Sequence, residues 1–190
     1  MIEIKNLNKI YLKGKKNMVH ALNNINLKID DRETVAIIGE SGAGKSTLLH
    51  IMSCIDNFDG EYYLDNIDIN KLSESKKSKL RSSKIGIVLQ DFALIDDFTV
   101  FENVMTPLYF NKKIKDKKGS VMRALKKTGI ASLKAKKVSQ LSGGQKQRVA
   151  ISRALVTSPE YIFADEPTGS LDSKTSEEIV KMLFDLNRNG

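Results

Sequence analysis

Apolar and polar residues alternate over much of the first thirty positions of the chain. The runs "MIEIKNL" at residues 1–7 and "HALNNINLKI" at residues 20–29 place apolar side chains at nearly every second position. This period of two predicts strands that are half buried. Residues 34–39, "TVAIIG", form instead a short continuous apolar run rich in β-branched side chains. Such a run predicts a buried strand in a parallel arrangement, and "DDRE" at residues 30–33 predicts the turn before it.

Short apolar runs and helical periodicity continue through the rest of the chain. Strands are predicted at residues 60–69, 84–90 and 160–165, and helices at residues 44–55 and 173–189. Asp172 or Ser173 is the expected cap of the last helix, because short polar side chains favour that position. Since strands alternate with helices, the pattern predicts an α/β fold with a mixed sheet whose buried strands lead into helices.

The middle of the chain has the periodicity of helices rather than strands. Val100, Val104 and Leu108 recur at every fourth position, which places them on one helical face. Pro107 is expected to end or kink this first helix, and Gly129 to end the second one. The pattern therefore predicts a helical block inserted between the strands of the mixed sheet.

Composition limits the class of protein. The chain has 190 residues, 41% of them hydrophobic and 28% charged, which is typical of one globular domain with a core. No apolar run approaches the ~20 residues needed to span a bilayer, and the N-terminus lacks an apolar signal-peptide core. The single cysteine, Cys54, excludes an internal disulfide and indicates a reducing compartment.

The formal net charge of +8 is concentrated in two lysine-rich segments, residues 71–84 and 111–137. Such a surplus can serve nucleic acid, anionic lipid or an acidic partner. Aromatic residues do not interleave with the lysines, as a single-strand stacking surface requires. A solvated helical surface is therefore favoured over a nucleic-acid site, and we expect the second segment to lie near anionic head groups or an acidic partner.

Residues 39–47, "GESGAGKST", match the phosphate-loop pattern G-x-x-x-x-G-K-[ST] between a predicted strand and a predicted helix. The stretch comprises Gly39, Glu40, Ser41, Gly42, Ala43, Gly44, Lys45, Ser46 and Thr47. Its glycines let the backbone curl so that amides at a helix N-terminus cradle phosphate oxygens. Lys45 is placed to reach the β and γ phosphates, Ser46 to bind Mg²⁺, and Thr47 to lie beside the α phosphate. The alternative, a glycine-rich turn with an incidental lysine, is disfavoured by the flanking strand and helix.

A second acidic element follows the predicted strand at residues 160–165, where "YIFADE" ends in Asp165 and Glu166. A carboxylate at the end of a buried strand is suited to hold Mg²⁺ beside a phosphate loop. Glu166 is then placed to polarise a water in line with the γ phosphate. Without the phosphate loop, this pair would be interpreted as an ordinary solvated strand end.

Three motifs together, "GESGAGKST", "LSGGQ" at residues 141–145 and "ADEPTGSLD" at residues 164–172, resemble the nucleotide-binding domain of ABC transporters. The resemblance covers essentially the whole chain. It implies a P-loop NTPase core with a mixed sheet, an antiparallel β subdomain at the N-terminus and an inserted α-helical subdomain. A single ATP-binding domain over residues 1–190 is expected, with its core in residues 1–90 and 138–190 and the helical subdomain in residues 91–137.

The resemblance also implies roles for single residues. Tyr11 resembles the aromatic residue that stacks on adenine, with Val19 beside it, although an early tyrosine can also serve in packing alone. Gln90 resembles a catalytic glutamine that touches Mg²⁺ and the attacking water, and it acts with Glu166 and Lys45. Asp172 resembles an aspartate that communicates across a dimer interface, a role compatible with capping a helix.

The resemblance implies a function that depends on assembly. Ser142, Gly143, Gly144 and Gln145 close over the ATP of a second copy, in a head-to-tail homodimer or pseudo-dimer. ATP hydrolysis with Mg²⁺ then opens the dimer, and the helical subdomain moves a transmembrane permease subunit. We therefore expect an ATPase that is cytoplasmic, peripheral on the inner face of the cell membrane and not a specific binder of nucleic acid.

The stretches "VHALNNINLKI", "QDFALIDDFTVFENVMTPL" and "DEPTGSLD" look most like the bacterial branch that includes lipoprotein-release, macrolide-efflux and antimicrobial-peptide transporters. Export or release of such substrates is the leading expectation. A mechanical or regulatory ATPase of the cell-division type is an alternative, and only the identity of the membrane partner would distinguish it from a transporter subunit. A nucleic-acid-associated ATPase is a further alternative, although residues 91–140 are too few for the long coiled coil of DNA-repair relatives.

Three features depart from the family's pattern. Arg32 stands where a turn glycine is usual and Leu89 where an aromatic residue is frequent. The chain ends at Gly190, before the further strand and the switch histidine of the family. His20 and His50 are its only histidines, and neither lies where the resemblance places that residue. We therefore expect that the C-terminal part of the domain is missing, and that the chain binds ATP but hydrolyses it slowly or not at all.

Overall fold

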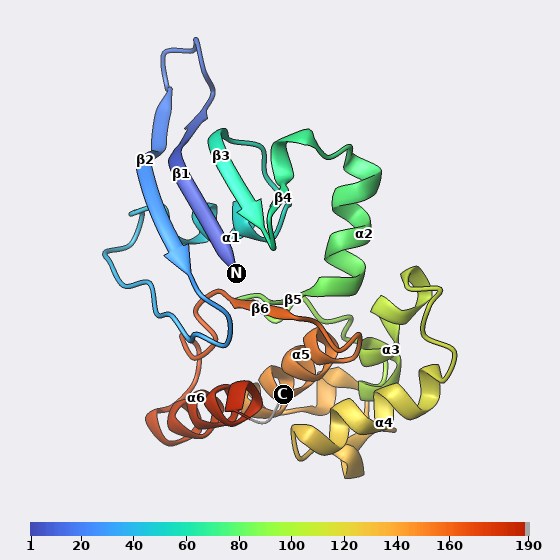
Figure 1. The fold of residues 1–190 in the computed structure, drawn as a ribbon. Coiled ribbons are helices and arrows are strands. Elements are labelled where there is room, and N and C mark those ends of the chain that lie inside the picture. The colour runs from blue at the N-terminus through green and yellow to red at the C-terminus, as the bar shows by residue number, and fades with distance from the viewer. Residues whose placement is uncertain (189–190) are drawn as a thin grey trace. The chain divides into compact units, whose positions relative to one another are not determined.

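The computed structural model describes residues 1–188, and the chain divides into two compact units, Met1–Lys79 and the part from Leu80 onward. Strands dominate the first unit and helices the second (Figure 1). Among the described residues, none of the helices has the length and apolar character that a membrane span requires.

An antiparallel sheet forms most of the first unit. Its strands are β1 (Ile2–Tyr11), β2 (Val19–Ile29), β3 (Asp59–Leu64) and β4 (Ile67–Asp68), in the spatial order β2-β1-β3-β4. β1 is central, because Ile2 lies opposite both Ile29 of β2 and Leu64 of β3. The strands predicted at residues 1–7 and 20–29 are confirmed, and each is longer than its apolar alternation indicated.

Helix α1 (Lys45–Met52) packs against this sheet within the first unit. Alternation along β1 buries Ile2 and Ile4, and Tyr62 of β3 and Ile51 of α1 are also inaccessible to solvent. The Tyr62 hydroxyl donates a hydrogen bond of 2.7 Å to the carbonyl of Met52. This contact joins the C-terminal end of α1 to the sheet. Together with the buried residues of α1 it fixes the helix, and thereby also its N-terminal end, against the core of the first unit.

Residues 34–38, for which the sequence predicts a buried parallel strand, have no regular secondary structure. All of residues 31–40 are exposed, and Ile38 retains 92% of its accessible surface. The prediction of a buried strand is therefore wrong for the described structure. A strand depends on hydrogen bonds and side-chain contacts from neighbouring strands, which β-branched residues do not supply by themselves. Within residues 1–188, no strand pairs with this segment.

Helix α2 is rich in basic residues, with five lysines and arginines along its length. It spans Glu74–Lys84 and follows the short 3-10 helix η1 (Ile69–Lys71). None of its residues is buried, and Lys77 pairs with Glu74 at 3.0 Å while Lys84 pairs with Glu160 at 2.8 Å. α2 is thus the solvated, lysine-rich helical surface that the sequence favours for residues 71–84.

Two parallel strands form the sheet of the second unit, β5 (Ile85–Val88) and β6 (Tyr161–Ala164). Ile85 of β5 lies opposite Tyr161 of β6, and the register is continuous from there. Both strands were predicted and are confirmed. Phe163 is 8% exposed but Ile162 is 37% exposed, so β6 is less buried than its apolar sequence predicts. Because the strands are parallel, the segments that follow them emerge at the same edge of the sheet.

Helices make up most of the second unit. They are α3 (Val100–Phe110), α4 (Lys117–Lys127), α5 (Gly143–Leu155) and α6 (Ser173–Arg188), with 3-10 helices η2 (Ala131–Leu133) and η3 (Val138–Gln140). Val104 of α3, Leu125 of α4 and Val149 of α5 are fully buried in one hydrophobic cluster. The helical periodicity predicted for this part of the chain is confirmed.

Two residues were expected to end helices in this block. Gly129 follows α4 with a left-handed φ of 74°, as predicted. Pro107 was expected to end or kink α3; it lies inside this helix, which continues to Phe110, so it does not end the helix. Val104 and Leu108 flank the proline and are fully buried, and we infer that this packing outweighs the roughly 3 kcal/mol that an internal proline costs.

Candidate functional site

The predicted phosphate loop, residues 39–47, leads into the N-terminus of α1. Gly42 and Gly44 adopt left-handed φ values of 84° and 86°, and Gly44 is the cap of α1. A Cβ atom on Gly44 would lie 2.3 Å from the carbonyl oxygen of Ala21, whereas one on Gly42 would meet no atom within 4 Å. Gly44 is therefore required both by its backbone angles and by the close approach of β2.

Lys45 bonds back to the first two residues of the phosphate loop. Its ammonium donates hydrogen bonds to the carbonyls of Gly39 at 2.8 Å and Glu40 at 2.7 Å. The first amides of α1 have no acceptors within the helix, and they lie at the positive end of its dipole. This combination of a cation, main-chain donors and the exposed hydroxyl of Ser46 is the chemistry that an anionic phosphate chain requires.

Tyr11 and Val19 face each other at the end of the β1–β2 pair. The Tyr11 hydroxyl donates to a carboxylate oxygen of Asp56 at 2.7 Å. Burial raises the pKa of this hydroxyl, a hydrogen bond with the Thr47 side chain lowers it, and the bond with Asp56 raises it again. Tyr11 therefore lies beside the first turn of α1. The Lys9 ammonium lies over the Tyr11 ring, 4.8 Å from its centroid. Tyr11 as a whole is 36% exposed, so part of its aromatic surface is accessible next to the loop.

In the second unit, the segments after β5 and β6 bring Gln90 and Glu166 together. The amide nitrogen of Gln90 donates to Glu166 Oε2 at 2.8 Å, although 76 residues separate the two in the sequence. The backbone amide of Asp165 donates to the carbonyl of Val88 at 2.9 Å, which extends the parallel ladder by one step. Glu166 has a left-handed φ of 42°. The two predicted catalytic side chains thus meet at the edge where the strands end.

Ser142 caps helix α5 in a reciprocal arrangement with Gln145. The Ser142 hydroxyl accepts from the Gln145 amide at 3.4 Å, and Gln145 Oε1 accepts from the Ser142 amide at 3.1 Å. A Cβ atom on Gly144 would lie 2.6 Å from Cγ2 of Thr175 in α6. The glycine pair of residues 143–144 therefore allows α6 to approach the start of α5 closely.

Asp172 caps α6 and faces the start of α5. Its carboxylate accepts from the amide of Thr175 at 3.0 Å and from the Thr175 hydroxyl at 2.6 Å. These hydrogen bonds, the hydroxyl bond foremost, hold the pKa of Asp172 below its ordinary value. Of the two predicted caps, Asp172 is confirmed. Residues at the starts of both helices line a cavity of about 350 Å³: Ser142, Gly143, Gly144, Gln145, Arg148, Ser170, Leu171, Asp172, Thr175 and Glu178.

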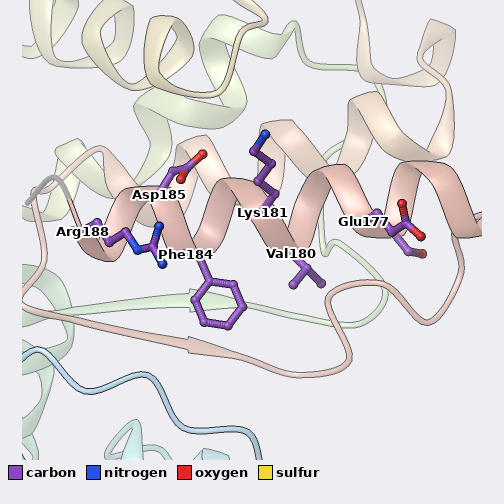
Figure 2. A pocket seen from close by; sticks show the side chains of 7 residues that line it. Glu177, Val180, Lys181, Phe184, Asp185 and Arg188 are labelled. Carbon is purple, nitrogen blue, oxygen red and sulfur yellow. The ribbon is translucent and has the colours of Figure 1, made fainter.

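A second hollow lies along the outer face of α6 and contains none of the predicted site residues. Its volume is about 600 Å³. Val180 and Phe184 point to one side of the helix, while Lys181 and Asp185 point to another (Figure 2), as the helical period requires. Val180 and Phe184 are 41% and 46% exposed.

The structure adds two arginines of α5 that no sequence motif singled out. Arg148 donates to the carbonyl of Thr128 at 3.0 Å and to Glu178 at 2.9 Å, beside the cavity described above. Arg153 donates to the carbonyls of Phe92 and Ala93, just after Gln90. The sequence placed both on a helix, but their partners lie far away along the chain and depend on tertiary packing.

The predicted site residues thus form one group in the first unit and two groups in the second. The first unit brings Tyr11 to the phosphate loop, and the second brings Gln90 to Glu166 and residues 142–145 to Asp172. Within residues 1–188, no three His, Cys, Asp or Glu side chains gather in a cluster that could hold a metal ion on its own. A metal here would need other oxygen ligands, such as hydroxyl, amide or phosphate groups.

Comparison with known proteins shows similarity over nearly the whole chain. Residues 22–169 match the family described as ABC transporter. The ATP-binding protein LolD of the lipoprotein-releasing system of Wigglesworthia glossinidia brevipalpis is 42% identical over 189 residues, which cover 98% of this chain and 82% of LolD. The macrolide export ATP-binding/permease protein MacB of Mannheimia succiniciproducens is 43% identical over 192 residues, which cover 100% of this chain and 30% of MacB.

A solved structure gives the same result for the fold. The ATP-binding cassette MJ0796 of Methanocaldococcus jannaschii, solved as a dimer in a post-hydrolysis state with ADP and Pi, matches with a TM-score of 0.88. The two chains are 44% identical in this comparison, which covers 98% of this chain and 83% of the MJ0796 chain.

Proposed function

The chain belongs to the ABC transporter family as an ATP-binding ATPase domain, and on this premise we propose that it hydrolyses ATP to power a membrane transporter. The observation that carries the proposal is the contact between Gln90 and Glu166 at the adjoining ends of β5 and β6. A carboxylate and an amide held together at a sheet edge are suited to orient a water molecule for attack on a phosphate.

We assign ATP binding to the phosphate loop together with Tyr11 and Val19. The amides of residues 42–47 and the Lys45 ammonium bind the phosphate groups. The ring of Tyr11 provides an aromatic surface for the adenine, and Val19 lies opposite it with 54% of its surface exposed. When phosphate binds, Lys45 exchanges the carbonyls of Gly39 and Glu40 for charged oxygens. That exchange is favourable because hydrogen bonds between ionised groups are stronger than those to a neutral carbonyl.

Ser46, Gln90 and Asp165 are the residues that we assign to Mg²⁺. They offer a hydroxyl, an amide oxygen and a carboxylate, which are the oxygen ligands that this ion prefers when it is also bound to phosphate. The amide nitrogen of Gln90 donates to Glu166, so its amide oxygen is the atom that we assign to the cation. When bound, the ion neutralises charge on the phosphate oxygens.

We propose that residues 142–145 and Asp172 close over the nucleotide of a second copy. The polar cavity that they line, of about 350 Å³, supports this role, since its serine hydroxyl and helix N-terminus favour an anion. MJ0796 is a dimer in its solved structure. An isologous pair of chains would then hold two nucleotides, and the assembly would depend on ATP.

The names of two relatives support a proposal for the substrate class and location. LolD belongs to a lipoprotein-releasing system and MacB to macrolide export. We propose that this chain drives a transmembrane permease that releases or exports a peptide, antimicrobial or lipoprotein-type substrate. It would then act at the cytoplasmic face of the cell membrane, without a specific nucleic-acid partner.

The variant Glu166→Gln tests the proposal. It removes the charge that polarises water but keeps the size of the side chain, so hydrolysis is expected to fall by about 100-fold or more. An ATP-bound dimer should accumulate, visible by light scattering after gel filtration with saturating ATP and Mg²⁺.

Glu160→Gln is the matched control, because Glu160 precedes β6 at its other end and pairs with Lys84. This control should hydrolyse ATP at the wild-type rate and form no stable dimer. Hydrolysis by Glu166→Gln at the wild-type rate would contradict the proposed role, and a purely monomeric Glu166→Gln with ATP bound would contradict the proposed assembly.

A further inference from the structure

The chain turns sharply just after Gln90. Phe92 and Ala93 both have left-handed φ values, 61° and 44°. Residues with a Cβ atom adopt this conformation only when their surroundings impose it. The exposed side chain of Gln90 precedes this turn by two residues, so the turn decides where Gln90 is held.

Arg153 of α5 contacts this turn, which backbone hydrogen bonds from Phe92 to Leu89 and from Ala93 to Asp91 also hold. One terminal nitrogen donates to the carbonyl of Phe92 at 2.8 Å and the other donates to the carbonyl of Ala93. A planar guanidinium matches two adjacent acceptors in a way that a lysine ammonium cannot. Burial lowers the pKa of Arg153 and the nearby Asp91 carboxylate opposes this effect, but arginine remains a cation under all ordinary conditions.

We propose that Arg153 is a positioning residue for hydrolysis, which holds the turn at residues 92–93 so that Gln90 meets Glu166. The amide of Gln90 lies 2.8 Å from the carboxylate of Glu166, while both side chains are exposed and receive little support from packing. The backbone on both sides of Gln90 therefore restrains this contact: the β5–β6 ladder before it and the turn after it. The inference rests on the proposed function only for its effect on the ATPase rate.

A second anchor keeps the same segment rigid further along. Asn103 of α3 is 1% exposed, and its side chain donates to the carbonyls of Ile95 and Thr99 at 3.0 and 3.1 Å. It also accepts from the amide of Ile95 at 2.8 Å. The segment after Gln90 is thus attached to α5 at one end and to α3 at the other. Since α5 begins at residues 142–145, a displacement of that helix would be transmitted through Arg153 to Gln90.

The first test measures position without requiring activity. Arg153→Lys keeps the charge but cannot hold both carbonyls. Arg123→Lys is its matched control, because Arg123 also uses both terminal nitrogens, toward Asp116, the cap of α4, and Ser120 in α4. The side-chain amide signal of Gln90 is recorded by NMR in the nucleotide-free full chain and assigned by its loss in Gln90→Glu. Arg153→Lys should shift or broaden it and Arg123→Lys should not; an unchanged signal in Arg153→Lys would overturn the proposal.

The second test separates positioning from a general structural role. Arg153→Lys should lower kcat for ATP about tenfold to a hundredfold, the usual effect of a small misplacement, with KM within about twofold of wild type. In a Gln90→Ala background, the same substitution should cause no further loss in single-turnover hydrolysis. Equal losses in both backgrounds would overturn the proposal. Failure of the wild-type chain to bind ATP would instead count against the proposed function, while the NMR measurement would still decide the position of Gln90.

Discussion

The phosphate loop and the glycine pair of α5 both place glycines at the start of a helix, but different forces shape them. In the phosphate loop, residues 39–47, the path depends on two left-handed glycines and on hydrogen bonds from Lys45 to nearby carbonyls. At residues 143–144 the glycines are required by a neighbouring helix, because Thr175 of α6 approaches Gly144. The conformation of the phosphate loop thus depends mainly on local backbone geometry, whereas the glycines of α5 are required by packing between two helices.

The two regions therefore differ in the contacts that keep them ordered. The loop lies next to residues 31–40, which are all exposed, so its order rests on a few polar contacts. The start of α5 is held by a reciprocal cap and by α6. We therefore expect substitutions in the loop to affect backbone geometry and ligand binding. A larger residue at Gly144 should instead cause a steric clash that a smaller side chain at the facing position of α6 removes.

Gly44→Ala should have the largest effect. The left-handed φ costs about 1–2 kcal/mol without glycine, and a Cβ atom 2.3 Å from the carbonyl of Ala21 adds strain, for a total of about 2–4 kcal/mol of unfolding free energy. Gly42→Ala has a similar φ but open space around it, so its cost should be about 1–2 kcal/mol. Urea unfolding of both variants checks this order. Equal losses would show that the backbone angle alone matters.

Lys45→Ala tests the polar side of the loop. Loss of a charged hydrogen-bond donor to phosphate should weaken ATP binding by about 2–3 kcal/mol, a thirtyfold to 150-fold increase in Kd. Titration with a fluorescent ATP analogue measures this change. Lys13→Ala is the control, since Lys13 is an exposed lysine 3.8 Å from Asp59, and it should leave Kd unchanged. A Lys45→Ala variant that binds as tightly as Lys13→Ala would contradict the assignment.

Gly144→Ala tests the packing interpretation. The new methyl group would lie 2.6 Å from Cγ2 of Thr175, so unfolding free energy should fall by about 1–3 kcal/mol. Adding Thr175→Ser removes that Cγ2 atom but retains the hydroxyl that bonds Asp172. The double variant should therefore recover most of the loss in thermal unfolding. If it does not, backbone conformation rather than the contact with α6 requires glycine here.

Asp172 should give the smallest effect, and one that depends on pH. Its pKa is lower in the folded chain than the ordinary 3.8 because Thr175 donates two hydrogen bonds to it. The charged form therefore stabilises the fold above about pH 4, and this contribution is lost as pH falls through the folded pKa. Asp172→Asn should lower Tm at pH 7, and the difference from wild type should shrink below pH 4. A difference that is constant with pH would exclude the charge as its cause.

The comparison also shows where sequence patterns were sufficient. Alternation predicted β1 and β2, and helical spacing predicted the shared burial of Val104 and Leu108. The same reasoning failed for residues 34–38, because β-branched residues can form a buried strand only where other strands accept them. Pro107 does not end α3, because burial of its neighbours outweighed the local cost of proline.

The candidate site divides in the same way. Residues 39–47 were predicted from residue type and spacing, since phosphate binding requires glycine, lysine and hydroxyl residues in a fixed order. Residues 141–145 were predicted from the resemblance to the ABC transporter family. The residues that contact these motifs were not predicted. The contact of Thr175 with Gly144 and that of Arg153 with the turn after Gln90 both depend on which helices pack together. No local pattern carries that information.

By itself, then, the sequence determined which residues we predict to carry the chemistry: the loop around Lys45, the carboxylates Asp165 and Glu166, and the glycine pair of α5. It did so because each motif is contiguous and its chemistry is set by residue type. Only the tertiary structure decided that Gln90 meets Glu166 at 2.8 Å and that Arg153 holds the turn beside them. Those contacts join segments about 60 to 76 residues apart, and only the packing of β5, β6 and α5 brings such segments together.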